Sequence, residues 1–286
     1  MTLPGRRALA IGCALITGFG PSFAQGDVNR GQYVAKAAGC KGCHTDTTAG
    51  AAPYAGGREI ATPFGKFYGP NITPHPIHGL GKWSETDLWR ALRLGESPNG
   101  AHYYPAFPYP SFTAMTDADI RDLWAYLRSL PPVDRANRSH ELRFPFAWRA
   151  FVAVWKWLFF AAQPFVPHPR ASAALNRGAY LVNVLGHCGE CHTPRNLLGG
   201  SKNDRHLAGG LLPDGRVPNL TPTRLKKWSD SQLREFLRSG ATPEGDAPSD
   251  VMYEVIRNTT SQLTSQDLDA VVAYLRSLPP LPDEPK

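Results

Sequence analysis

The chain contains two copies of one sequence pattern, and this duplication limits its possible fold more than any other feature. The motif Cys-x-x-Cys-His-Thr occurs at residues 40–45 and again at 188–193, while AYLRSLPP at 125–132 returns unchanged at 273–280. Such self-similarity indicates a duplicated domain of about 105 residues. The other matches are NRG-x-Y (29–33 and 176–180), AGG (55–57 and 208–210), PN-I/L-TP (70–74 and 218–222) and KWS (82–84 and 227–229).

Each copy carries the start and stop signals of three helices. A serine or threonine with an acidic or amide partner three residues on opens a helix, and a glycine or proline ends it. No alternating strand pattern occurs, so we predict an all-α protein with Gly- and Pro-rich loops between the helices. The helices are expected at 29–38, 84–95 and 116–130 in the first copy and at 176–185, 229–240 and 264–278 in the second.

The first 24 residues have the features of an export signal. Arg6 and Arg7 precede an apolar stretch, and the small residues of Ser22-Phe23-Ala24 predict cleavage after Ala24. The apolar stretch is shorter than the roughly 20 residues that span a bilayer, so it is not expected to be a membrane anchor. The apolar run of the linker is also short and carries Arg149 and Lys156, so no transmembrane anchor is expected in the mature chain. The expected organisation is a signal peptide at 1–24, domains at 25–133 and 175–286, and an aromatic-rich linker at 134–174.

Charge excludes one class of partner. The 31 basic and 24 acidic residues give a net charge of +7, but the basic residues are scattered and do not cluster on one segment. Nucleic-acid binding is therefore not expected. A basic surface can instead steer an acidic protein partner toward the molecule.

The two Cys-x-x-Cys-His motifs predict cofactor attachment. Two thiols at this spacing can reach the two vinyl groups on one porphyrin edge, and the following histidine can bind the iron. A thioredoxin-like redox pair needs a βαβ context, and a zinc site needs both cysteine pairs to converge. We therefore expect two covalently bound haem c groups, attached through Cys40, Cys43, Cys188 and Cys191, with His44 and His192 as proximal iron ligands.

Two methionines remain once Met1 is lost with the signal, and each follows one of the motifs. A thioether is a common distal ligand of c-type haem, so Met115 and Met252 are the candidates for that position. They are not equivalent in the repeat, because Met115 aligns with Leu263. His102 is the second candidate for the first haem.

The join between the copies is rich in aromatic residues. We expect it to pack as a shared wedge across both domains, or else to serve as a docking surface for a partner or a membrane. Its aromatic residues are Phe144, Phe146, Trp148, Phe151, Trp155, Trp157, Phe159 and Phe160.

The motifs together resemble those of dihaem class I cytochromes c, in particular the cytochrome c subunits of periplasmic alcohol, aldehyde and gluconate dehydrogenases. The resembling segments are GCxxCHT, AGG, PN-I/L-TP, KWS, residues 102–117, residues 186–200 and AYLRSLPP. The resemblance implies two tandem class I cytochrome c domains, each wrapped around its haem. It also implies that the carbonyl groups of Pro70 and Pro218 accept the ring N–H of the proximal histidines.

The function implied is periplasmic electron transfer from a dehydrogenase to a downstream cytochrome or terminal oxidase, without other chemistry on a substrate. The family often has a methionine where Phe107 stands here. An alternative is therefore a dihaem enzyme, of the peroxidase or thiosulfate dehydrogenase type, with an open distal position at the first haem. A third hypothesis is an assembly subunit whose aromatic linker docks a large dehydrogenase.

Overall fold

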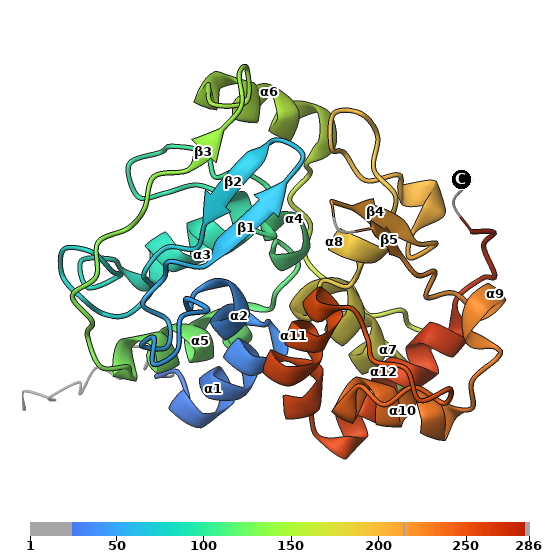
Figure 1. The fold of residues 1–286 in the computed structure, drawn as a ribbon. Coiled ribbons are helices and arrows are strands. Elements are labelled where there is room, and N and C mark those ends of the chain that lie inside the picture. Colours follow the sequence, from blue (N-terminus) through green and yellow to red (C-terminus); the bar gives the residue numbers. More distant parts are fainter. Residues whose placement is uncertain (1–24, 214, 284–286) are drawn as a thin grey trace, which may run out of the picture.

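The computed structural model describes residues 25–213 and 215–283, so the expected export signal lies outside the described residues. The chain forms two similar, largely helical halves that lie side by side (Figure 1). No helix within 25–213 or 215–283 is long and apolar enough to cross a bilayer. The first half contains α1 (Val28–Ala37), α2 (Cys40–Cys43), β1 (Glu59–Thr62), β2 (Gly65–Tyr68), α3 (Glu85–Leu94), α4 (Tyr109–Phe112) and α5 (Asp117–Ser129).

The linker and the second half follow in chain order. The linker contains β3 (Glu141–Leu142) and α6 (Arg149–Phe159). The helices of the second half are α7 (Ala173–Tyr180), η1 (Leu181–Leu185), α8 (Gly189–His192), η2 (Asn203–Arg205), α9 (Pro222–Leu225), α10 (Asp230–Ser239), α11 (Asp250–Asn258), η3 (Thr260–Gln262) and α12 (Ser265–Ser277). Its strands are β4 (Gly210–Leu212) and β5 (Gly215–Val217).

The predicted helix boundaries are confirmed for the helices with strong caps. Ser84 forms a capping box with Asp87 at the start of α3, and Gly95 ends that helix in a left-handed conformation with φ 60°. The same box opens α10 with Ser229 and Gln232. Each box satisfies two backbone donors that the first turn of a helix otherwise leaves without partners.

The structure differs from the prediction in several places, including the short helices α4 and α9 and the linker helix α6. Short antiparallel ribbons, β1–β2–β3 and β4–β5, add strands to the fold that was expected to be all-α. Helix α11 occupies a segment expected to be a loop, and Ser249 caps its first turn. The first helix of the second half, α7, continues as the π-helical turn η1 just before the second cysteine motif. These ribbons are too short to produce a periodic signal.

Within each half the first and last helices cross closely at a glycine. A Cβ built on Gly31 would lie 1.9 Å from the carbonyl oxygen of Asp122 and 2.8 Å from the Cβ of Tyr126. In the second half, a Cβ on Gly178 would lie 2.0 Å from the carbonyl oxygen of Ala270. The absence of a side chain at these positions allows the two backbones to touch.

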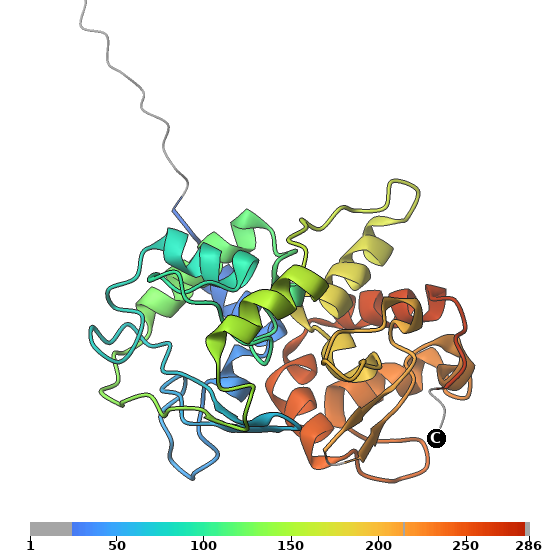
Figure 2. The ribbon, with the colours of Figure 1, turned by 90° about the horizontal axis from the view of Figure 1, so that it is seen from above.

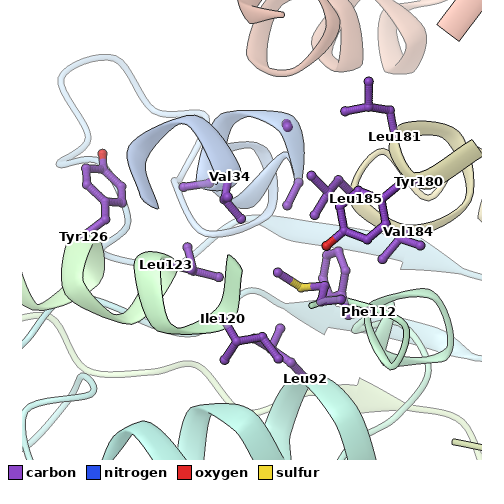
Figure 3. Close-up of a cluster of buried hydrophobic side chains, with 14 of the residues drawn as sticks. Val34, Leu92, Phe112, Ile120, Leu123, Tyr126, Tyr180, Leu181, Val184 and Leu185 are labelled. Atoms are coloured by element: carbon purple, nitrogen blue, oxygen red, sulfur yellow. The ribbon is translucent and has the colours of Figure 1, made fainter. Parts of the chain in front are cut away.

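The halves share a hydrophobic core. Side chains of α1, α3, α4 and α5 face side chains of α7 and η1 across the junction (Figure 3), including Val34 and Phe112 on one side and Leu181 and Leu185 on the other. The halves thus contact each other directly. The linker helix contacts both of them: Lys156 donates to the Leu94 carbonyl of the first half, and Trp155 donates to the Leu198 carbonyl of the second. Seen from above, α6 lies over their junction (Figure 2).

Two tyrosines join the halves in a reciprocal way. The hydroxyl of Tyr33 on α1 donates to Asp267 of α12 at 2.5 Å and accepts the N–H of Thr264 at 3.2 Å. The equivalent Tyr180 on α7 donates to Asp119 of α5 at 2.6 Å. It also accepts the Thr116 N–H at 3.0 Å. Each first helix therefore binds the start of the other half's last helix, which gives the junction an approximate two-fold symmetry.

Candidate haem sites

The first cysteine motif forms a single helical turn. Gly39, with φ 63°, turns the chain out of α1 and into α2. The His44 N–H donates to the Cys40 carbonyl at 3.0 Å, which closes the turn around both cysteines. The second motif is closed in the same way by the His192 N–H and the Cys188 carbonyl at 2.9 Å. All four cysteines of these motifs are free thiols.

Both histidines that are candidates for the proximal ligand are oriented by a proline carbonyl. His44 Nδ1 lies 2.8 Å from the Pro70 oxygen, and His192 Nδ1 lies 2.7 Å from the Pro218 oxygen. A carbonyl can only accept, so Nδ1 carries the proton and the Nε2 lone pair is left for a metal. Burial lowers the pKa of both histidines despite these hydrogen bonds, which keeps the rings neutral.

The AGG segment that follows each motif binds the backbone carbonyl of the histidine. The carbonyl of His44 accepts the Gly56 N–H, and that of His192 accepts the Gly209 N–H, both at 2.8 Å. A Cβ on Gly56 would lie 2.6 Å from the Asn71 nitrogen, so only glycine fits at this crossing. The AGG segments thus bring the histidine and the PN-I/L-TP segment (70–74 or 218–222) together.

The threonine of each motif supports a strained residue. The hydroxyl of Thr45 accepts the Tyr54 N–H at 3.0 Å, and that of Thr193 accepts the Leu207 N–H at 3.0 Å. Tyr54 and Leu207 have φ of 62° and 60°, which non-glycine residues rarely adopt. The same strained backbone conformation occurs at equivalent positions of both halves, which indicates that the architecture of the site requires it.

Sequence reasoning missed the role of the asparagine in PN-I/L-TP. Asn71 Oδ1 accepts from the Thr73 backbone and hydroxyl at 3.0 and 2.7 Å, and its Nδ2 donates to the Val133 carbonyl at 2.9 Å. Asn219 repeats this with Thr221 and the Leu281 carbonyl. The buried amide therefore joins the PN-I/L-TP segment to the segment after the last helix of the same half. The repetition of the motif was the available signal.

The chemistry of the thiols disfavours the two competing interpretations of the motif. Burial raises the pKa of Cys40 and of Cys188 to about 12, whereas reactive dithiols have lowered values. Across residues 25–213 and 215–283, no three His, Cys, Asp or Glu side chains gather into a cluster that could hold a metal ion. The cysteine pairs therefore do not converge in the way that a zinc site requires.

The two candidate distal ligands lie in different surroundings. Met115 lies between α4 and α5 in the shared core and is 1% exposed. Met252 lies in the first turn of α11 and is half-buried. The two copies differ at this point, because Met252 lies on α11, a helix without a counterpart in the first half.

The structure places the other candidates of the first half elsewhere. His102 Nδ1 lies 3.0 Å from the Lys156 ammonium, and because an ammonium group can only donate, that nitrogen accepts. Phe107 packs on the rings of Tyr103 and Phe112 at centroid distances of 5.7 and 5.9 Å. This is an ordinary aromatic core contact, and it provides no support for the open-site enzyme alternative.

These residues fit haem c. Each half presents two free thiols on one turn, a neutral histidine with Nε2 available, and a methionine later in the chain. When bound, a haem iron supplies a one-electron couple whose potential depends on its axial ligands. The fold and the donor set together define a protein with two tandem c-type haem domains.

Comparison with known proteins agrees with this class. The cytochrome c family model matches residues 28–131 and 176–279. A diheme cytochrome c-type protein of Cereibacter sphaeroides is 44% identical over 89% of this chain and 86% of its own length. The chain belongs to the cytochrome c family, and it carries two covalently bound haem c groups and functions in electron transfer.

Two further relatives are subunits of dehydrogenases. The cytochrome c subunit of the quinone-dependent alcohol dehydrogenase of Gluconobacter oxydans is 37% identical over 96% of this chain. The cytochrome c subunit of the gluconate 2-dehydrogenase of Pantoea cypripedii is 38% identical over 88% of it. The chain spans 60% and 59% of the lengths of these two relatives.

Proposed function

We propose that this protein is a periplasmic electron carrier that accepts electrons from a dehydrogenase and passes them to a downstream cytochrome or terminal oxidase. In this proposal Cys40 and Cys43 attach the first haem, and Cys188 and Cys191 attach the second. His44 and His192 are the proximal ligands. Met115 and Met252 are the distal ligands.

The single observation that carries the proposal is the repeated contact between the proximal histidine and a proline carbonyl. This contact holds each imidazole in the tautomer with the proton on Nδ1, so that the lone pair of Nε2 is free to bind iron. The free thiols on the preceding turn support covalent attachment through two thioether bonds. None of these residues forms a nucleophile–base pair, which supports a relay and not a hydrolytic or transfer reaction.

The relatives support the choice of donor, because two of them are cytochrome subunits of alcohol and gluconate dehydrogenases. The net charge of +7 falls to +5 once Arg6 and Arg7 are lost with the signal, and it supports an acidic partner, since opposite charge accelerates encounter. The export signal expected at residues 1–24 supports the periplasm as the compartment. Haem attachment to exported chains is consistent with the same location.

The test is to express the full chain with a haem-attachment system and analyse periplasmic material by mass spectrometry. We expect a chain that begins at Gln25 and carries two haem masses. Cys43→Ala or Cys191→Ala should each remove stable attachment from one half only. A single haem in the parent, or a chain that a quinone-dependent alcohol or gluconate dehydrogenase cannot reduce, would overturn the corresponding part of the proposal.

A further inference from the structure

Helix α6 has its apolar side turned to solvent. Phe151, Val154, Trp157 and Leu158 are all exposed, and Trp157 is 82% exposed. A helix on the surface of a globular protein ordinarily places polar side chains outward and apolar ones inward. The outward side of α6 contains no charged residue after Arg149 in its first turn.

The lysine of α6 points inward instead. Lys156 is buried, and its ammonium donates to the Leu94 carbonyl at 2.6 Å and contacts His102 at 3.0 Å. Val152 on the same inner side is also buried. The inner side of α6 is therefore fixed on the protein by these contacts, and its apolar outer side faces solvent while the helix is packed in place.

The exposed apolar surface continues beyond the helix onto the second half. Trp155 Nε1 donates to the Leu198 carbonyl at 3.0 Å, which brings the loop of residues 196–200 beside α6. Leu197 in this loop is 100% exposed. We define the α6 patch as the exposed side chains of Phe144, Trp148, Phe151, Val154, Trp157, Leu158, Leu197 and Leu198.

The charge at the start of the patch is positive. Residues 142–189 contain no Asp or Glu. Arg143 and Arg149 are exposed just before α6 and at its first residue, whereas Lys156 is buried beneath the helix and Arg177 is paired with Asp267. Beside the start of α6 is a cavity of about 300 Å³, whose lining includes Arg138, His140 and Arg149. Two acidic residues lie near this cavity: Glu141 is 3.5 Å from Arg138, and Glu59 interacts with the same guanidinium. Arg149 donates to the His102 carbonyl and lies over the Tyr104 ring, which fixes its guanidinium at the rim.

We propose that the α6 patch docks on the surface of an anionic phospholipid bilayer. Tryptophan concentrates at the boundary between headgroups and acyl chains, and a helix with Trp, Phe and Leu on one face and basic flanks lies flat in that boundary. Arginine pairs with phosphate oxygens, so Arg143 and Arg149 would contact headgroups while α6 lies in the interface. The basic flanks favour this occupant over a second copy, whose own patch would carry the same charges.

The test uses the haem-loaded full chain and vesicles of equal parts phosphatidylglycerol and phosphatidylethanolamine, with phosphatidylcholine vesicles for comparison. We expect flotation with the anionic vesicles, weakened by salt, and quenching of tryptophan fluorescence by brominated acyl chains. Phe151→Ser combined with Trp157→Ser should lower the partition coefficient by about tenfold or more, because both rings are then lost from the interface. Arg143→Gln should weaken binding to the anionic vesicles alone.

The matched control is Ile77→Ser, which removes a side chain that is 74% exposed but outside the patch. Its partition should equal that of the parent, and unchanged haem absorption and circular dichroism should show that all variants fold. Equal loss in the control, or no quenching by anionic vesicles, would overturn the proposal. It would also be overturned if the double variant only abolished a dimer or only abolished binding to a purified dehydrogenase. Because vesicle binding needs no electron donor, its failure would leave the proposed relay intact.

Discussion

At the scale of single residues, the two methionines give the sharpest test of the sites. Met115→Leu and Met252→Leu remove a thioether while nearly preserving side-chain volume, which limits the loss of stability to roughly 1.5 kcal/mol. Each change should lower the reduction potential of one haem, since a methionine ligand raises it. The long-wavelength absorption of ferric iron bound to sulfur should fall to about half in each variant.

The control for this prediction is His102→Ala. The nitrogen of His102 that faces Lys156 is already used, so the change should leave both potentials unaltered. If Met115→Leu kept the full absorption, Met115 would be only a core residue. The protein would then resemble the open-site alternative, provided that the parent also bound carbon monoxide at one haem.

Asp267 gives a prediction about pH. Burial by itself raises the pKa of this carboxyl, but hydrogen bonds from Arg177 and Tyr33 outweigh it and hold the pKa below its ordinary value. Stability from ionised Asp267 is therefore complete above about pH 4, the unfolded value, and is lost as pH falls through the lower folded value. Urea unfolding between about pH 4 and pH 2 should show a smaller loss in Asp267→Asn than in the parent. The control is Asp246→Asn, at an exposed residue in the loop before α11, and this variant should follow the parent.

At the scale of elements, the glycine crossings determine how closely the first and last helices pack. A side chain at residue 31 would meet the Asp122 carbonyl at 1.9 Å, so the helices must separate to admit it. Gly31→Val should lower the free energy of unfolding by about 1–3 kcal/mol. Chemical unfolding followed by circular dichroism measures this.

Gly42→Ala is the comparison for Gly31→Val. Its Cβ would find only an ordinary contact at 3.7 Å with Asn258, so stability should change little. A stable Gly31→Val variant would mean that residue 31 merely begins a helix. Gly178→Val should behave as Gly31→Val does, because the same crossing occurs in the second half.

The elements also show what the sequence could and could not predict. The capping box at Ser84 and the left-handed Gly95 are local signals, so the limits of α3 could be predicted. Strands of four residues or fewer have no such signal, so β1 to β5 were missed. The cysteine and histidine candidates came from spacing alone. The contact between Tyr33 and Asp267 joins residues 234 apart, and no local pattern contains that information.

At the scale of the whole molecule, the reciprocal tyrosines hold the halves together. Tyr33→Phe removes a hydroxyl that binds a carboxylate, and the net loss should be about 1.5–3 kcal/mol in the free energy of unfolding. Tyr180→Phe should cost a similar amount, since it removes the equivalent contact with Asp119. Calorimetry of the double variant should show the two halves beginning to unfold separately.

The exposed Tyr253→Phe is the control for these two variants and should leave a single transition in place. If the double variant still unfolded in one step with parental stability, the shared apolar core alone would join the halves. The tyrosines would then be dispensable for assembly.

The approximate two-fold junction has a consequence for how the protein can change. A dimer of identical chains receives every substitution twice, so its two metal centres keep the same ligands and the same affinity for an electron. Here one polypeptide supplies both halves of the dimer-like junction, and each centre can be altered alone. With the proposed methionine ligands, the placement of Met115 beside α5 and of Met252 on α11 would be such an alteration. A fused pair can therefore acquire a downhill order for electrons that a symmetric pair cannot have.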